Sequence, residues 1–182
     1  MKLKTKLVPL LLIVFSQYAL AGVISVEDRL AINEAIASYG HNFDRANGEG
    51  FANLFEPDGR WDAFPNKVPK ALISLQGRKE IADFANDRAQ MFIDVGIETK
   101  HFMLDIVITR QSEKEVHCSV MALIVWQRPL SGDPLPRPVQ TGYYDYVLRK
   151  SDEGWKFHQV NVLTSGFYKP GDIYSDLKMG SK

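Results

Sequence analysis

The chain has 182 residues, a length that suits one domain or a small pair of domains. Hydrophobic residues make up 45% of it and charged residues 24%, so it can bury a core, which argues against wholesale disorder. Its 22 basic and 22 acidic residues balance, without the basic excess of a protein that binds nucleic acid by neutralising phosphates. Cys118 is the single cysteine, which excludes an internal disulfide and a cysteine-based zinc cluster.

Residues 1–21 have the pattern of a secretory signal peptide. Three lysines precede an apolar run over residues 7–15, and Ala19 and Ala21 place small side chains just before a cleavage site. The apolar run is much shorter than the roughly 20 residues that span a bilayer. We therefore expect cleavage after Ala21, secretion or export to the periplasm, and no membrane attachment of the mature chain. Residues 22–182 are expected to form a single domain with a C-terminal tail over residues 166–182.

The start of the mature chain predicts a long helix. Ser25 followed by Asp28 is a capping-box pattern. Apolar residues then recur three or four positions apart from Ile32 to Phe43, which places them in one stripe on a helix. Asn47 and the two glycines that follow it are expected to end this helix.

Beyond residue 100 the pattern changes from helical to strand-like, with segments rich in Val, Ile, Tyr, Phe and Trp. Residues 128–138 hold four prolines and a glycine, which predicts a long exposed hairpin loop. In chain order after the first helix, we expect a short helix over residues 51–56, a strand over 60–64, a helix over 78–92, and strands over 101–109, 116–127, 140–150 and 154–163. Helices followed by an antiparallel meander predict an α+β fold with the helices against one curved face of the sheet.

Two residues are candidates for acid–base chemistry. His101 begins the first long strand, and Asp105, four residues later, is expected on the same face. Asp44, near the end of the first helix, could orient the imidazole of His101 and stabilise its charged form, as the acid of a catalytic triad does. Spacing alone does not bring Asp44 to His101. An exposed carboxylate for Asp44, a surface position for His101 and a core position for Tyr39 therefore stay open as alternatives.

The sequence lacks several other chemical signatures. It has no His-x-x-x-His or His-x-His pair, no Gly-x-Ser-x-Gly elbow and no glycine-rich phosphate loop after a strand. We therefore expect neither a metal nor a cofactor. Cofactor-free acid–base chemistry or simple binding remain as the two classes of function.

The order of motifs resembles the SnoaL-like branch of the NTF2-like superfamily over roughly residues 26–167. The residues that carry the resemblance are Tyr39, Asp44, Phe55 and Trp61 in order, then Lys100-His101-Phe102, then Gly154-Trp155-Lys156-Phe157. The resemblance implies a cone-shaped, cystatin-like fold, in which a strongly bent antiparallel sheet wraps around three N-terminal helices and encloses a deep pocket.

Within this superfamily the sequence is most similar to scytalone dehydratase, bile-acid 7α-dehydratase and hexachlorocyclohexane dehydrochlorinase, which perform eliminations with a His–Asp pair and no metal. The resemblance implies His101 and Asp44 as this pair and Tyr39 as the acid or oxyanion donor. The groups that act on the leaving group in these enzymes fall on Val160, on Trp126 or Gln127, and on Ala63, so their substrates do not carry over. The candidate substrate-binding residues are Tyr144, Asn161, Trp61 and Asp105.

These observations predict a cofactor-independent lyase or isomerase for a small hydrophobic substrate, with polycyclic and aromatic molecules as candidates. The alternative is a non-catalytic periplasmic module for ligand binding or protein association. A third possibility is a partner subunit resembling the small subunit of ring-hydroxylating dioxygenases. An Asp44–His101 hydrogen bond facing an open pocket would favour the enzyme. A homo-oligomer, dimer or trimer, is expected, and the tail over residues 166–182 either caps the pocket or frays.

Overall fold

The computed structural model describes residues 24–66, 68–132, 134–174 and 176–177. The helices are α1 (Val26–Asp44), α2 (Gly48–Ala52), α3 (Gly77–Asp94) and α4 (Pro170–Ile173), and the strands are β1 (Phe55–Pro65), β2 (Ile73–Gln76), β3 (Glu98–Gln111), β4 (Glu115–Gln127), β5 (Arg137–Ser151) and β6 (Gly154–Thr164). In this part of the chain no helix has the length and apolar character to cross a membrane. The signal peptide predicted over residues 1–21 lies outside the described residues.

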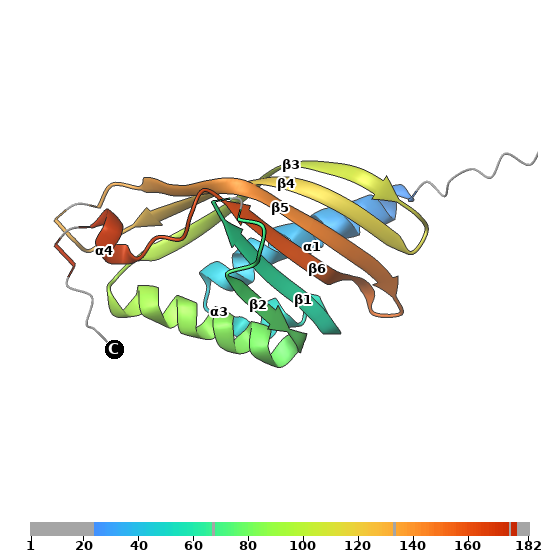
Figure 1. Cartoon of the computed structure of the whole chain (residues 1–182), viewed down its shortest axis with the longest axis horizontal. Helices are drawn as coiled ribbons and strands as arrows, with labels where there is room; N and C mark the ends of the chain where they lie inside the picture. The colour runs from blue at the N-terminus through green and yellow to red at the C-terminus, as the bar shows by residue number, and fades with distance from the viewer. Residues whose placement is uncertain (1–23, 67, 133, 175, 178–182) are drawn as a thin grey trace, which may run out of the picture.

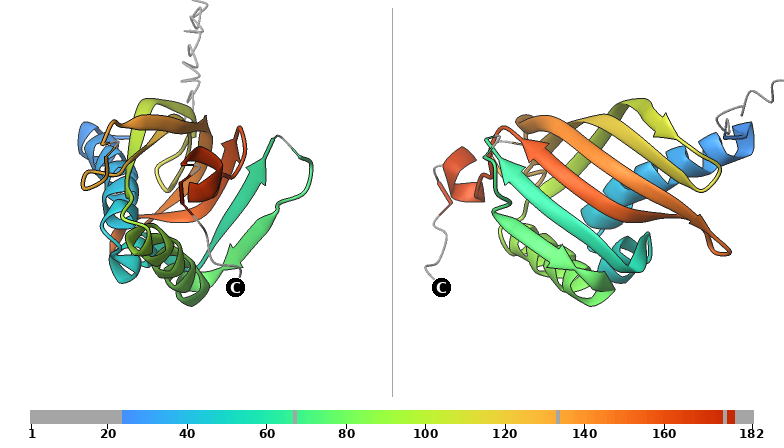
Figure 2. Two further views of the ribbon diagram at one scale, coloured as in Figure 1. Left: turned by 90° about the vertical axis from the view of Figure 1, so that its left-hand side faces the viewer. Right: turned by 45° about the vertical axis from the view of Figure 1, so that its right-hand side comes forward.

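The strands form one six-stranded sheet in the order β2-β1-β6-β5-β4-β3 (Figure 1). Neighbouring strands are antiparallel except β1 and β6, which run parallel with Trp61 opposite Val160. The sheet is strongly curved, with α1 and α3 on the side towards which it bends (Figure 2). The predicted α+β class and the bent sheet around helices are confirmed. The parallel pair is an addition, because a meander accounts only for the consecutive strands β3 to β6.

Alternation along the strands gives the sheet one apolar face. On β4, for example, every second residue from Val116 to Trp126 is buried, and the residues between them are at least partly exposed. The buried residues belong to the same core cluster as the apolar stripe of α1, which contains Ile32, Ile36 and Phe43. The predicted start of α1 is also confirmed, because the Oγ atom of Ser25 accepts a hydrogen bond from the Asp28 N–H at 3.0 Å.

The segment after α1 differs from the prediction. Helix α1 ends at Asp44, before Asn47, as predicted, but Asn47 also caps a new helix, since its side-chain oxygen accepts from the Gly50 N–H at 3.0 Å. Helix α2 therefore spans Gly48–Ala52, so the predicted short helix is present but begins and ends earlier than the predicted bounds of residues 51–56. Strand β1 begins at Phe55 and continues through Pro57, which lies at a shift in the β1–β6 register where the strand ladder needs no N–H donor.

Candidate active site

A histidine and an aspartate from distant parts of the sequence meet where α1 packs on β3. The Nδ1 atom of His101 lies 2.6 Å from Oδ1 of Asp44, and the backbone N–H of His101 donates to the other carboxylate oxygen at 2.7 Å. The exposed fractions of the two side chains are 10% for His101 and 9% for Asp44. The structure thus brings together the two residues predicted as a pair, and the exposed alternative for each does not apply.

The two contacts with Asp44 determine how the imidazole is oriented. In the neutral ring that fits this hydrogen bond, Nδ1–H donates to the carboxylate, so Nε2 carries a lone pair and no hydrogen. The ring of Phe43 packs edge-on against the imidazole with the centroids 5.0 Å apart. His101 is therefore held in place with Nε2 as its remaining hydrogen-bond acceptor.

Gly40, one helical turn before Asp44, allows α1 to approach β3 closely. A Cβ atom at this position would lie 3.1 Å from both the Cβ and the carbonyl oxygen of His101. The glycine therefore sets the separation between the two elements. That separation in turn decides whether the carboxylate of Asp44 can reach His101.

The imidazole forms part of the wall of an interior cavity of about 60 Å³. Side chains from α1, α3, β1 and β3 to β6 complete the wall, and most of them are aromatic or aliphatic. Tyr39, Trp61 and Tyr144, which the sequence singled out, all line it. A cavity of this volume has room for a few water molecules.

Tyr39 lies in this wall with its hydroxyl oxygen accepting a hydrogen bond from Nε1 of Trp61 at 2.8 Å. Burial, with a smaller effect from Tyr144, raises the pKa of Tyr39 well above its ordinary value of 10.0. The phenol therefore stays protonated at neutral pH. Because the oxygen already accepts from Trp61, the phenolic hydrogen is the part of the group that can bond to a ligand.

Tyr144 contacts Tyr39 edge-on, with the ring centroids 5.8 Å apart. Burial raises the pKa of Tyr144 as well, and the negative charge of Asp44 raises it further. The cavity thus contains two neutral phenols close to the His101–Asp44 pair. Both are suited to donate hydrogen bonds, because neither gives up its proton in the neutral range.

Asp105 does not reach the cavity. It is exposed and has a positive φ of 49°, at a shift in the β3–β4 register between Leu104 and Val107. Such a bulge breaks the alternation of side chains, so the four-residue spacing from His101 no longer places Asp105 on the inner face. The prediction of a shared face is corrected on this point.

Asn161 is also placed away from the cavity. It lies on β6 between Val160 and Val162, which are buried on the inner side of the sheet, so its own side chain points to the outer face. There its Oδ1 atom accepts a hydrogen bond from Gln159 Nε2 at 3.0 Å. The expectation that Asn161 lies in the pocket is therefore corrected too.

The beginning of the C-terminal tail closes one side of the cavity. Phe167 and Tyr168 are part of its wall. The segment before them is tied to β5, since Nε2 of Gln140 donates to Oγ1 of Thr164 at 3.0 Å and to the carbonyl oxygen of Gly166. Of the two alternatives for the tail, the described part takes the capping position.

Sequence reasoning missed three polar residues of the cavity wall, Arg88 on α3, Thr99 on β3 and Gln140 on β5. A signal for Arg88 was present, because it lies four residues after Phe84 and four before Phe92, on the face predicted to point inward. Thr99 precedes His101 by two residues, so strand alternation gives them the same face. These residue types are common in helices and strands, so residue type alone did not indicate a position in a cavity wall.

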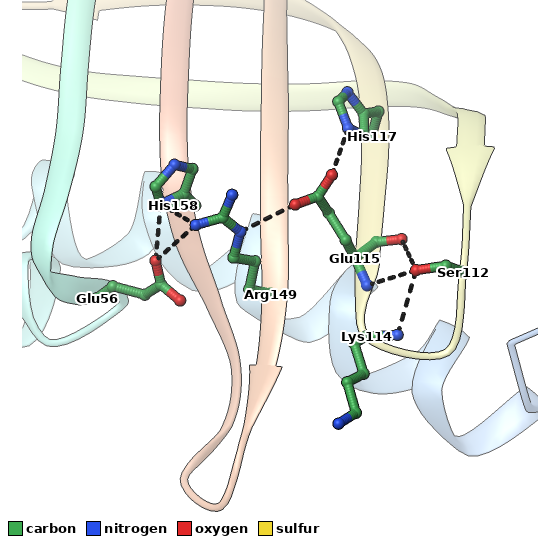
Figure 3. A network of polar contacts seen from close by, with 7 residues as sticks. All are labelled: Glu56, Ser112, Lys114, Glu115, His117, Arg149 and His158. Atoms are coloured by element: carbon green, nitrogen blue, oxygen red, sulfur yellow. Dashed lines mark hydrogen bonds and ion pairs between the residues drawn. The ribbon is translucent and has the colours of Figure 1, made fainter.

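His117 and His158 belong to a polar network on the outer face of the sheet (Figure 3). Nδ1 of His158 lies 2.8 Å from Oε2 of Glu56, and Nε2 of His117 lies 3.0 Å from Oε1 of Glu115. Arg149 links the two halves, since its Nε donates to Glu115 at 2.9 Å. No histidine in the described ranges belongs to a group of three or more potential metal ligands.

The curved sheet, the helices inside its bend and the interior cavity define the class of protein, an NTF2-like protein with a cystatin-like fold. A protein of this class from Novosphingobium aromaticivorans has a TM-score of 0.62 at 21% identity over 75% of this chain and 81% of that chain. A protein from Catenulispora acidiphila in complex with S-DNPA has a TM-score of 0.61 at 16% identity over 77% and 95%. A proposed beta subunit of an aromatic-ring-hydroxylating dioxygenase from N. aromaticivorans has a TM-score of 0.62 at 17% identity over 76% and 90%. At these identities the similarity shows the fold alone.

The model of the SnoaL-like domain family matches residues 25–161, and the chain belongs to this family. No curated protein matches the sequence significantly. The predicted family and the predicted fold are both confirmed.

Proposed function

We propose that this protein is a cofactor-independent lyase or isomerase of the dehydratase type, acting on a small hydrophobic substrate in the cavity. The observation that carries the proposal is the Asp44–His101 hydrogen bond beside an apolar cavity. A histidine held and polarised by a carboxylate is suited to general-base chemistry. The aromatic walls favour a hydrophobic substrate.

In the proposed elimination, Nε2 of His101 takes a proton from the carbon next to a carbonyl group. The electron pair of that C–H bond forms a C=C bond, and the hydroxyl group on the neighbouring carbon leaves as water with the proton that the imidazolium of His101 returns to it. Asp44 stabilises the imidazolium that forms in the first step. General-base assistance of this kind contributes about 10²–10⁴ in rate. In an isomerisation, the imidazolium returns the proton to a different carbon.

Tyr39 suits the role of a hydrogen-bond donor better than that of a proton donor. Its raised pKa means that transferring the proton away is costly, whereas donating a hydrogen bond to a developing enolate oxygen is favourable. A donor of this type is worth about 10²–10³ in rate where its contribution has been measured. Of the two roles expected for Tyr39, we therefore favour the oxyanion donor.

The size of the cavity bears on how a substrate enters. Its volume of about 60 Å³ is smaller than the roughly 150 Å³ of an apolar cavity that holds benzene. A substrate with one or more rings therefore requires part of the wall to move. Phe167 and Tyr168 are the candidates, because they come from the tail rather than from the sheet or the long helices.

The test is hydrogen–deuterium exchange in D₂O, followed by NMR. The protein is incubated with a panel of aryl and fused-ring ketones that carry a β-hydroxyl group, and loss of the α-proton and of water is recorded. We expect exchange with the native protein, a loss of about 10²–10⁴ in rate with His101→Gln, and a smaller loss with Asp44→Asn. The matched control is His117→Gln on the outer face, which should exchange at the native rate.

The outcome also separates the enzyme from a ligand-binding module. Compounds that bind, as judged by chemical-shift changes in the protein, but do not exchange would argue against the enzyme and for the module. Exchange that His101→Gln leaves intact would contradict the role of His101 even if turnover were real.

We also propose that the chain is exported by a cleaved N-terminal signal, on the basis of the lysines, apolar run and small residues in positions 1–21. Expression of the full chain in a bacterial host followed by mass spectrometry of the periplasmic fraction tests this. A mass that corresponds to a start at Gly22 is the expected result, and retention of the full-length chain in the cytoplasm would contradict it.

A further inference from the structure

Among the described residues of the cavity wall, Arg88 carries the one permanent charge. Arg88 lies on the inward face of α3, between Phe84 and Phe92, and all three side chains line the cavity. A guanidinium group in such a position has lost part of its hydration, and burial accordingly lowers the pKa of Arg88. It nevertheless stays charged at any physiological pH, because an arginine is not deprotonated in proteins.

Arg88 differs from the other half-buried arginines in what it contacts. Arg78, Arg128 and Arg149 each form an ion pair with a carboxylate. The polar contact of Arg88 is to Sδ of Met91, at 3.8 Å, and its guanidinium carbon lies 5.9 Å from the centre of the Phe167 ring. A thioether is a weak acceptor and an aromatic face is a weak counter-charge. The positive charge is therefore buried without the partner that normally compensates it.

A second polar group of the same cavity is also without a partner. Oγ1 of Thr99 is fully covered and forms no hydrogen bond, and the residue is 5% exposed. Burying a hydroxyl without a hydrogen-bond partner is unfavourable, so Thr99 gains from a ligand atom that accepts its hydrogen. Thr99 lies on the same strand as His101, two residues earlier, so a ligand in the cavity can contact both.

The cavity offers a ligand no negative charge. None of its described lining residues is acidic. The carboxylate of Asp44 is bonded to Nδ1 and to the backbone N–H of His101 and does not line the cavity. The guanidinium of Arg88, the unpaired hydroxyl of Thr99 and the aromatic wall form a set that complements an anion attached to an apolar ring.

We propose that the ligand of this cavity is an aromatic or alicyclic carboxylate, whose carboxylate group binds to the guanidinium of Arg88 and the hydroxyl of Thr99. This inference deepens the proposed function and rests on it in taking the cavity next to His101 as the substrate site. A carboxylate satisfies both groups at once, because its two oxygens accept a charge-assisted bond from arginine and a bond from threonine. Arg88 thereby selects the substrate and fixes its orientation relative to His101, while the base itself remains His101.

The test is equilibrium binding, which needs no turnover. Isothermal titration calorimetry is carried out with 3-phenylpropanoate and with 3-phenylpropanamide, which have nearly the same shape and differ in charge. The native protein should bind the carboxylate at least about tenfold more tightly than the amide. Arg88→Met should remove this preference and leave the affinity for the amide within about twofold, since methionine replaces the apolar stem of arginine.

Further variants show whether the effect belongs to this site. Arg110→Met removes an exposed arginine that does not line the cavity and should retain the full preference. Thr99→Val, which keeps the shape of the side chain, should weaken carboxylate binding by about three- to tenfold and leave amide binding unchanged. A native protein that binds both probes equally, or binds neither, overturns the proposal. So does a preference that survives in Arg88→Met.

The result is separable from that of the deuterium-exchange experiment. His101→Gln should keep the preference for the carboxylate, because His101 is not part of the proposed anion site. If the Arg88-dependent preference is found and no compound exchanges, including β-hydroxy ketones that also carry a carboxylate group, the proposed chemistry fails and the anion site stands. If exchange is found and the preference is absent, the enzyme stands and the anion site fails.

Discussion

Replacing Gly40 with alanine should press α1 and β3 apart at the point where Asp44 reaches His101. The new Cβ would lie 3.1 Å from the Cβ and from the carbonyl oxygen of His101, so β3 must give way by a few tenths of an ångström. Overpacking of this kind costs about 1–3 kcal/mol. Alanine in place of glycine inside a helix returns about 1 kcal/mol. We therefore expect the free energy of unfolding to fall by roughly 1 kcal/mol, with a range from about zero to 2 kcal/mol.

The assay is urea unfolding followed by circular dichroism, together with the NMR signal of the His101 Nδ1–H proton. That signal should move upfield in Gly40→Ala, because the contact of 2.6 Å between Nδ1 and Asp44 lengthens. Asn33→Ala, at an exposed position of the same helix, is the control and should gain about 0.5 kcal/mol without moving the signal. A Gly40→Ala protein that is more stable by the full helix-propensity gain, with the signal unchanged, would refute the close approach of α1 to β3.

Three further predictions follow from how buried or exposed particular side chains are. Cys118 is 2% exposed, and burial raises the pKa of its thiol to about 11. At about pH 8 only about one thiol in a thousand is therefore ionised. Iodoacetamide should label the native protein far more slowly than the urea-unfolded chain. Burial also raises the pKa values of Tyr39 and Tyr144 above 10.0, so above this pH both phenols remain protonated in the folded state while those of the unfolded chain ionise. The free energy of unfolding should therefore fall as the pH rises above 10.0, because ionisation stabilises the unfolded chain. Urea unfolding at a series of pH values should show a shallower fall for Tyr144→Phe. Met121 and Tyr143 lie opposite each other on the outer face and are 42% and 52% exposed, and we expect a second copy of the chain to cover this face in a homo-oligomer. Light scattering should show self-association of the native protein and a monomer for Met121→Lys. A monomeric native protein would contradict this expectation.

The spacing of apolar residues was sufficient to predict most of the secondary structure, because burying one face of a helix or strand requires apolar residues at the spacing of that element. The stripe from Ile32 to Phe43 and the alternation of β4 are visible in the sequence and buried in the structure. Strand β2 and the start of α2 could not be obtained in this way. Strand β2 has four residues, too few for a periodic pattern, and α2 depends on the hydrogen bond between the Asn47 side chain and the Gly50 N–H.

The candidate site was predictable in its members more than in its geometry. Asp44 and His101 were candidates from their positions in the expected elements, and the resemblance to a family implied them as a pair. Their contact depends on how closely α1 packs on β3, where Gly40 allows the close approach. Asp105 points outward because of a local bulge at which its φ is positive. The residue type does not indicate that a bulge occurs at this position. Arg88 could have been found, because a cation on a face assigned to the core is a conflict visible in the sequence itself.

The parallel neighbour of β1 is the last strand of the sheet, with Phe55 opposite Phe157 and Trp61 opposite Val160. During synthesis, β1 is completed long before β6 exists, and until then it has only the four residues of β2 to pair with. The pairing of β1 with β6 can form only after β6 has been synthesised, and it carries the entropic cost of closing the long stretch of chain between the two strands. Completion of the sheet is thus delayed by topology until residues 154–164 have been synthesised. In a chain with the proposed export signal, β1 lacks its parallel neighbour during most of synthesis.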